Sequence, residues 1–77
     1  MPGNNELANY TVKMENNASG DPVYVGKTAR GNASSLGVWQ IQKITYDGNG
    51  GVTDVQWPSK SDKFDFVWDD RTSYTYT

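Results

Sequence analysis

Residues 38–57, VWQIQKITYDGNGGVTDVQW, decide the fold of this chain. The first nine of them are rich in β-branched and aromatic side chains, which favour extended strands. The DGNGG stretch at 47–51 supplies the Asp, Asn and Gly that tight hairpin turns require, and residues 52–57 return to the alternation of a half-buried strand. The segment therefore predicts two antiparallel strands joined by a tight turn.

Strict alternation fails inside the first of these two strands. Trp39 and Ile41 share one side of an extended chain, whereas Ile44 and Tyr46 share the other side. A β-bulge near residues 42–43 would bring all four side chains to one face, and this is our first interpretation. The alternative is a central strand that is buried on both sides.

Three further segments extend the β pattern outward from this hairpin. Residues 10–14 and 23–27 alternate as half-buried strands do, with the turn-forming sequence NNASGDP between them. Residues 64–77 place aromatic side chains at alternate positions on both sides of a polar triplet, so they predict a second hairpin. In its turn we expect an Asp to accept backbone N–H bonds, and a basic side chain to pair with a carboxylate or cover aromatic surface. The predicted turn residues are Asp69, Asp70 and Arg71.

The whole pattern predicts an all-β fold. No window shows a sustained apolar period of 3.6 residues, so we expect no long helix. Five to six short strands indicate a small antiparallel β-sandwich or half-open barrel. We expect residues 1–9 to form a flexible N-terminal arm and residues 10–77 to form a single β domain. The side chains predicted to fill its core are Trp39, Ile41, Ile44, Val55, Phe64 and Trp68.

Composition excludes several classes of protein. The chain of 77 residues has no Cys and no His, so disulfides are impossible and a zinc site has no soft ligand. Seven basic and nine acidic residues give a net charge of −2 and lie scattered, which predicts no nucleic-acid partner. No signal peptide or membrane-spanning apolar run is present, so we expect synthesis in the cytoplasm and no membrane partner. Because so small a core gives little stability, we expect a homo-oligomer or a multicopy assembly.

Two groups of carboxylates resemble functional sites, but a structural explanation fits each of them better. Residues 47–54 begin like a calcium-binding EF loop, yet Val52 stands where the bend needs Gly and Pro58 stands where a bidentate Glu belongs. Asp65 and Asp69 lie near aromatic residues, as in a glycosidase, but a chain of this size rarely has a cleft that shifts a carboxyl pKa. We therefore predict no catalytic residue, no metal, no cofactor and no enzymatic activity.

The aromatic residues supply the candidates for contact with a partner, since Tyr and Trp are common at protein interfaces. Two Tyr residues fall on the predicted terminal strand, whose edge would be open to another chain, although burial in the core explains them equally well. Trp57 directly precedes Pro58, which ends its strand. The stretch 29–37 is the longest predicted loop, and such loops often carry contacts. The predicted protein-contact residues are Tyr74, Tyr76, Arg30, Leu36 and Trp57.

Three segments together resemble a known group of proteins. They are YVGK at 24–27, WQIQKITYDGNG at 39–50 and FDFVWDDRTSYTY at 64–76. Their combined pattern, Trp-x-Ile-x-Lys-Ile followed by Phe-x-x-Val-Trp-Asp-Asp-Arg-x-x-Tyr-x-Tyr, is similar to that of small virion-associated proteins encoded among the structural genes of tailed bacteriophages.

This resemblance implies a location in the virion and a structural role. We expect a non-enzymatic module attached to the exterior of the capsid, neck or tail, as a decoration or accessory protein. Its partners would be further copies of itself or a major capsid or tail protein. The alternative is a carbohydrate- or receptor-binding module of a phage adhesion apparatus, in which exposed Trp or Tyr side chains stack on sugar rings.

Overall fold

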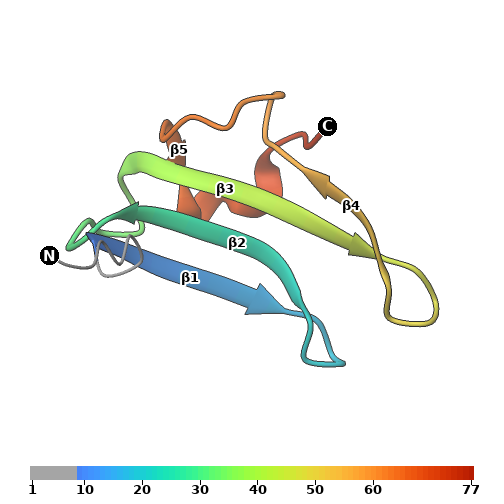
Figure 1. Ribbon diagram of the computed structural model, residues 1–77. Coiled ribbons are helices and arrows are strands. Elements are labelled where there is room, and N and C mark those ends of the chain that lie inside the picture. The colour runs from blue at the N-terminus through green and yellow to red at the C-terminus, as the bar shows by residue number, and fades with distance from the viewer. Residues whose placement is uncertain (1–8) are drawn as a thin grey trace, which may run out of the picture.

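The computed structural model describes residues 9–77, which form five strands and one 3₁₀ helix (Figure 1). The predicted arm therefore lies outside the described residues except for Asn9, and it stays a prediction. The elements are β1 (Tyr10–Asn16), β2 (Pro22–Ala29), β3 (Gly37–Tyr46), β4 (Val52–Gln56), β5 (Phe66–Val67) and the 3₁₀ helix η2 (Trp68–Ser73).

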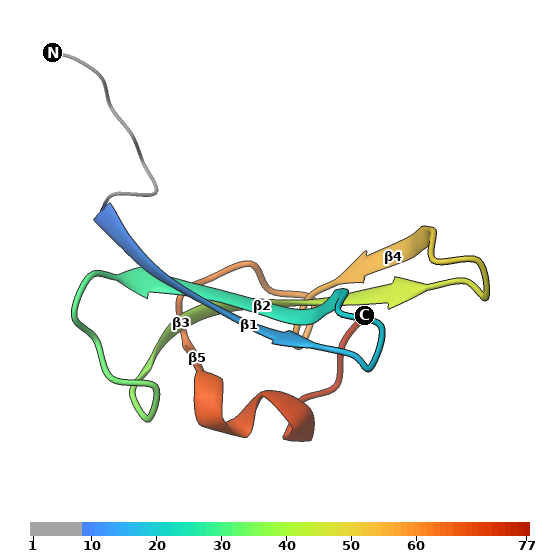
Figure 2. The same cartoon turned by 90° about the horizontal axis from the view of Figure 1, so that it is seen from below.

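The strands make one open antiparallel sheet. Strands β1 to β4 lie in sequence order, and β5 pairs with the first part of β3. Strand β3 is central, since its second half pairs with β4 and its middle pairs with β2. The prediction of an all-β, antiparallel fold is confirmed. Within residues 9–77 the sheet does not close into a barrel, and the layer that packs on it is η2 rather than a second sheet (Figure 2).

Two hairpin turns with the same hydrogen-bonding pattern set the strand order. In the β1–β2 turn, Asn17 Oδ1 accepts the N–H groups two and four residues further on, at 2.9 and 3.0 Å. In the β3–β4 turn, Asp47 Oδ1 does the same at 2.8 and 2.9 Å. These bonds favour the ionised carboxylate, so they lower the pKa of Asp47. Gly20 and Gly50 follow at φ of +86° and +85°, a conformation that favours glycine.

The expected bulge near residues 42–43 is wrong. The β2–β3 register runs without a shift from Tyr24 opposite Lys43 to Lys27 opposite Gln40. The irregularities of β3 instead fall between Thr45 and Tyr46, where it pairs with β4, and between Gly37 and Trp39, where it pairs with β5. Because alternation is kept through residues 40–43, the apolar side chains of β3 divide between the two faces of the sheet.

One face of the sheet, which we call the covered face, packs against η2 (Figure 2). Trp39 and Ile41 lie on it with no exposed area, and Trp68 of η2 is 6% exposed. The rings of Trp39 and Trp68 lie 5.9 Å apart between centroids. Gly26, directly opposite Ile41, makes room for Trp68, because a Cβ at that position would lie 2.4 Å from Trp68 Cε3. These contacts form the core.

The predicted hairpin of residues 64–77 is wrong beyond its first strand. Only Phe66–Val67 forms a strand of this segment, and the polar triplet that was expected to form a turn belongs to the helix Trp68–Ser73. The physical reason is non-local, since coiling the chain at this point places Trp68 over Gly26.

The C-terminal residues are already paired within the chain. Trp57 and Thr77 exchange two backbone hydrogen bonds at 3.1 and 3.0 Å, and Ser59 N–H donates to the carbonyl of Thr75 at 2.9 Å. Tyr76 forms a bridge with Pro58 between these bonds. The predicted open edge at the C-terminus is therefore wrong.

Two residues expected in the core are exposed. Val55 is 49% exposed and Phe64 is 38% exposed, while Ile44 is only half-buried. Val55 lies opposite Ile44, and both point to the face that η2 does not cover. The core predictions for Val55 and Phe64 were wrong because they assumed that all the apolar residues would share one face.

We predict that Gly26→Ala lowers the free energy of unfolding by about 1–3 kcal/mol, because the added Cβ meets the ring of Trp68. Urea denaturation followed by circular dichroism measures the change. The matched control is Gly48→Ala, because open space surrounds that position. Equal stability of the two variants would contradict the proposed packing.

Candidate interaction surface

The opposite face of the sheet, which we call the uncovered face, is partly apolar and accessible to solvent. Val12 and Met14 of β1 lie on it at 38% and 60% exposure, beside the half-buried Val25 of β2. Ile44 and Val55 form a second apolar pair on this face, across β3 and β4, and Gln42 lies opposite Val25 on β3. Exposed apolar side chains gathered on one face of a sheet make that face a candidate for contact with a partner.

A groove runs across the uncovered face, and we call it the Trp57 groove. Its volume is about 360 Å³. Apolar side chains of β1 and β2 form one side, half-buried Trp57 forms the other, and amide and ammonium groups lie between them. The lining residues are Val12, Met14, Val25, Lys27, Gln40, Gln42 and Trp57.

The connection after β4 crosses one end of this face. Gln40 Nε2 donates to the carbonyl of Asp62 at 2.6 Å. The Phe64 ring stacks on Tyr10 with centroids 6.1 Å apart, and Lys27 Nζ lies 4.8 Å from the centre of the Tyr10 ring. The Tyr10 and Phe64 side chains thereby close one end of the uncovered face.

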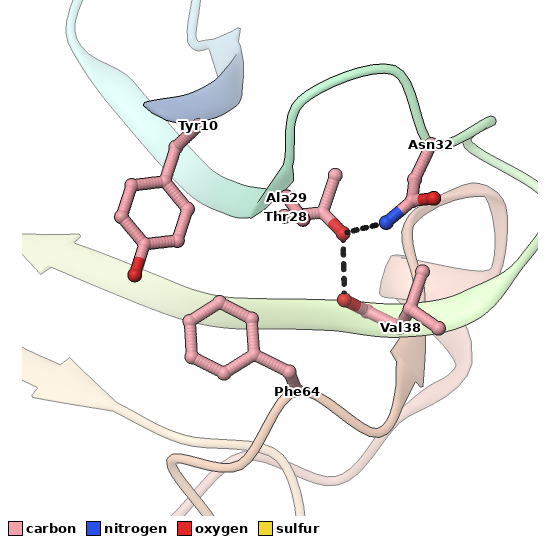
Figure 3. A pocket seen from close by; sticks show the side chains of 6 residues that line it. All are labelled: Tyr10, Thr28, Ala29, Asn32, Val38 and Phe64. Carbon is pink, nitrogen blue, oxygen red and sulfur yellow. Dashed lines mark hydrogen bonds between the residues drawn. The ribbon is translucent and has the colours of Figure 1, made fainter. Parts of the chain in front are cut away.

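A second hollow, of about 350 Å³, lies beside this aromatic pair (Figure 3). Its polar groups are already bonded to one another, since the Thr28 hydroxyl donates to the Val38 carbonyl at 2.7 Å and accepts from Asn32 Nδ2 at 3.1 Å (Figure 3). The lining residues are Tyr10, Thr28, Ala29, Asn32, Val38 and Phe64, none of which carries a carboxylate, an amine or an imidazole. The arrangement has a structural role, because Thr28 has no exposed area.

Tyr74 and Tyr76 do not lie on an open edge, so their predicted contact role is corrected. Both pack against the core. The Tyr74 hydroxyl accepts the N–H of Val67 at 2.9 Å, and the Tyr76 hydroxyl donates to the carbonyl of Arg71 at 2.8 Å. Burial, with a smaller contribution from Tyr24, raises the pKa of Tyr76, so this donor keeps its proton.

The other predicted contact residues lie on separate parts of the surface. Trp57 lines the groove on the uncovered face. Arg30 and Leu36 are exposed in the loop between β2 and β3, and Leu36 is 47% exposed. That loop also supports the core, because the Ala33 carbonyl accepts from Trp39 Nε1 at 3.0 Å and the Ser34 carbonyl accepts from Asp69 N–H at 3.2 Å.

The polar triplet of residues 69–71 is structural, although it forms a helix and not a turn. Arg71 Nε donates to Glu15 Oε1 of β1 at 2.8 Å, and its guanidinium carbon lies 4.7 Å from the centre of the Trp68 ring. The basic side chain therefore both pairs with a carboxylate and covers aromatic surface. Within residues 9–77 the carboxylates of Asp69 and Asp70 accept no hydrogen bond, so the expected Asp contact to backbone N–H groups is wrong.

The described residues hold no cluster of three or more side chains that suit a metal ion. The Asp47 carboxylate already accepts two backbone N–H groups of its own turn. In residues 9–77 no helix is long and apolar enough to cross a membrane.

Sequence reasoning missed most of the groove. Val12 and Met14 were assigned to a half-buried strand, and Gln40 and Gln42 were assigned no role. The sequence signal that could have revealed it is the failed alternation of residues 38–46. It places apolar side chains on both faces of the strand, as in a strand that is buried on both sides.

Comparison with protein-family models, curated proteins and solved structures finds no match for this chain. The geometry of the two faces and the sequence resemblance therefore supply the basis for a proposed function.

We predict that Trp57 accounts for most of the tryptophan emission that a soluble quencher can reach, because Trp39 and Trp68 are buried. Acrylamide titration of the native protein and of Trp57→Phe measures this. The variant should resist quenching, and unfolding it in urea should restore access. Equal quenching of the two folded proteins would contradict the placement of Trp57.

Proposed function

We propose that this chain is a non-enzymatic adhesion module that acts through protein contacts of its uncovered face. One observation carries the proposal: β3 has apolar side chains on both sides, but within residues 9–77 the helix η2 covers only one of them. A partner that covers Ile44, Val55 and the groove would bury the remaining apolar surface, and burial of such surface drives association.

The setting in this proposal is the exterior of a tailed-bacteriophage virion, on the capsid, neck or tail. It is supported by the resemblance of the segments at 24–27, 39–50 and 64–76. The physical properties agree with it, because a small domain without disulfides gains stability when many copies associate or dock on a larger particle.

We predict that the double variant Val12→Ser/Val55→Ser binds purified capsids or tails at least about tenfold more weakly than the native chain, because it removes exposed apolar groups from the contact. Co-sedimentation with the particles measures binding. Stability should change little, since both side chains are exposed.

The matched control is Leu36→Ser, which alters an exposed apolar side chain in the loop between β2 and β3. Loss of binding in the control with none in the double variant would assign the contact to the loop and contradict the proposal. Absence of native binding to capsids and tails alike would contradict it too.

The second candidate function is carbohydrate binding at the Trp57 groove. It is favoured by the exposed part of an indole beside the amides of Gln40 and Gln42, since aromatic faces stack on sugar rings while amides bond hydroxyl groups. Trp39 and Trp68 cannot take part, because both are buried in the core.

For this second candidate we predict that a glycan array probed with the labelled chain gives signals that Trp57→Phe weakens and Leu36→Ser leaves unchanged. Tyr10→Phe, which keeps the ring stacked on Phe64, serves as a further control. An array without signal at high protein concentration removes the carbohydrate hypothesis and leaves the protein-contact proposal in place.

A further inference from the structure

The outer edge of β1 is the longest strand edge that no described residue pairs with. Strand β1 spans seven residues and pairs only with β2. At the other side of the sheet, β4 is shorter, and the C-terminal residues pair with the chain directly after it. An edge strand of this length offers a row of free backbone donors and acceptors to another strand.

The backbone groups that point outward from β1 can be identified. Asn9 lies opposite Arg30 in the extended register, and Arg30 N–H donates to the Asn9 carbonyl at 3.2 Å. In an antiparallel ladder, the residues that bond to the neighbour alternate with residues whose backbone groups point away. Residues 11, 13 and 15 therefore bond to β2, and Val12, Met14 and Asn16 present their N–H and C=O groups to a further strand.

Among the registers centred on Lys13, Met14 or Glu15, the charges of β1 favour one for a second copy of the same strand. Lys13 and Glu15 lie on the covered face, since they are opposite Gly26 and Tyr24. Pairing two copies with Lys13 opposite Lys13, or with Glu15 opposite Glu15, would set like charges against each other. Placing Met14 opposite Met14 instead sets each Lys13 opposite a Glu15 of the other copy.

That register also matches the outward backbone groups of the two strands and the spacing that the charged pairs need. Met14, with its outward backbone groups, pairs with itself, and Val12 pairs with Asn16 of the other copy. The side chains at positions 13 and 15 fall in the closer, non-hydrogen-bonded pairs, where charges interact best. Glu15 uses one carboxylate oxygen for Arg71, and its side chain is 43% exposed, which leaves the second oxygen for Lys13.

We infer that two copies of this chain pair antiparallel through their β1 edges, with Met14 opposite Met14 and Lys13 opposite Glu15. The inference deepens the proposed function and rests on it, because the pairing joins two uncovered faces into one continuous adhesion surface. Met14 is 60% exposed in the single copy, and this arrangement brings it to the centre of the joined surface.

The test exchanges charges between two variants. In a homodimer, Lys13→Glu alone would place an acidic side chain opposite Glu15 of the other copy in both pairs. Glu15→Lys alone would place a basic side chain opposite Lys13 of the other copy in both pairs. Each variant should be monomeric by analytical ultracentrifugation at concentrations where the native chain is dimeric. An equimolar mixture restores both ion pairs, so it should form a heterodimer at least about tenfold tighter than either homodimer.

Two controls separate this arrangement from a general effect of charge or folding. Lys43→Glu makes the same change of charge on the central strand β3, so it should leave the dimer intact. Met14→Pro removes an outward N–H without removing a bond to β2, so it should give a folded monomer. Circular dichroism and urea denaturation confirm that each variant is folded, above all Glu15→Lys, because this change also removes the ion pair of Glu15 with Arg71.

The outcomes distinguish the dimer from the proposed function. A native chain that stays monomeric, or a dimer that the mixture of variants does not restore, overturns this inference. If the native chain is a monomer that still binds capsids or tails, the inference that a second copy pairs with β1 is wrong, and the adhesion role stands. A dimer with the predicted response to charge exchange that binds neither particle supports the pairing and overturns the adhesion role.

Discussion

The rest of the structure depends on the contact of Trp68 with Trp39 across Gly26. The position without a Cβ on β2 lets an indole ring lie directly on the sheet. Arg71 and Tyr76 hold the helix that carries this ring, the first by its ion pair with Glu15 and the second by its bond to the Arg71 carbonyl. Because the central strand is apolar on both sides, this contact decides which face becomes the core.

Covering one face uses most of the large side chains that the chain has. Trp39, Trp68, Tyr74 and Tyr76 all pack on the same side. The uncovered face thus keeps exposed Val and Met side chains beside a groove. The two-sided apolar pattern of β3 therefore leaves one face of the sheet uncovered within residues 9–77, and the proposed partner would complete its burial.

Local patterns predicted the segments whose structure depends on near neighbours. The strands at 10–14, 23–27 and 38–57 were predicted because alternation and turn residues such as Asp47 act within a few positions. The terminal hairpin was predicted wrongly, because alternating aromatics in residues 64–68 fit a strand as well as they fit a chain that coils to insert Trp68. The Trp57 groove escaped prediction because its lining comes from three strands and from Trp57, which directly follows β4.

The sequence by itself determined an antiparallel β fold, its hairpin turns and the presence of apolar residues on both sides of β3, since these follow from side-chain period and turn chemistry. Only the tertiary structure decided which side is buried. That choice depends on the match between Gly26 and Trp68, which lie 42 positions apart in the chain. It also decided that Tyr74 and Tyr76 pack against the core and that Val12, Met14 and Trp57 line the groove on the uncovered face.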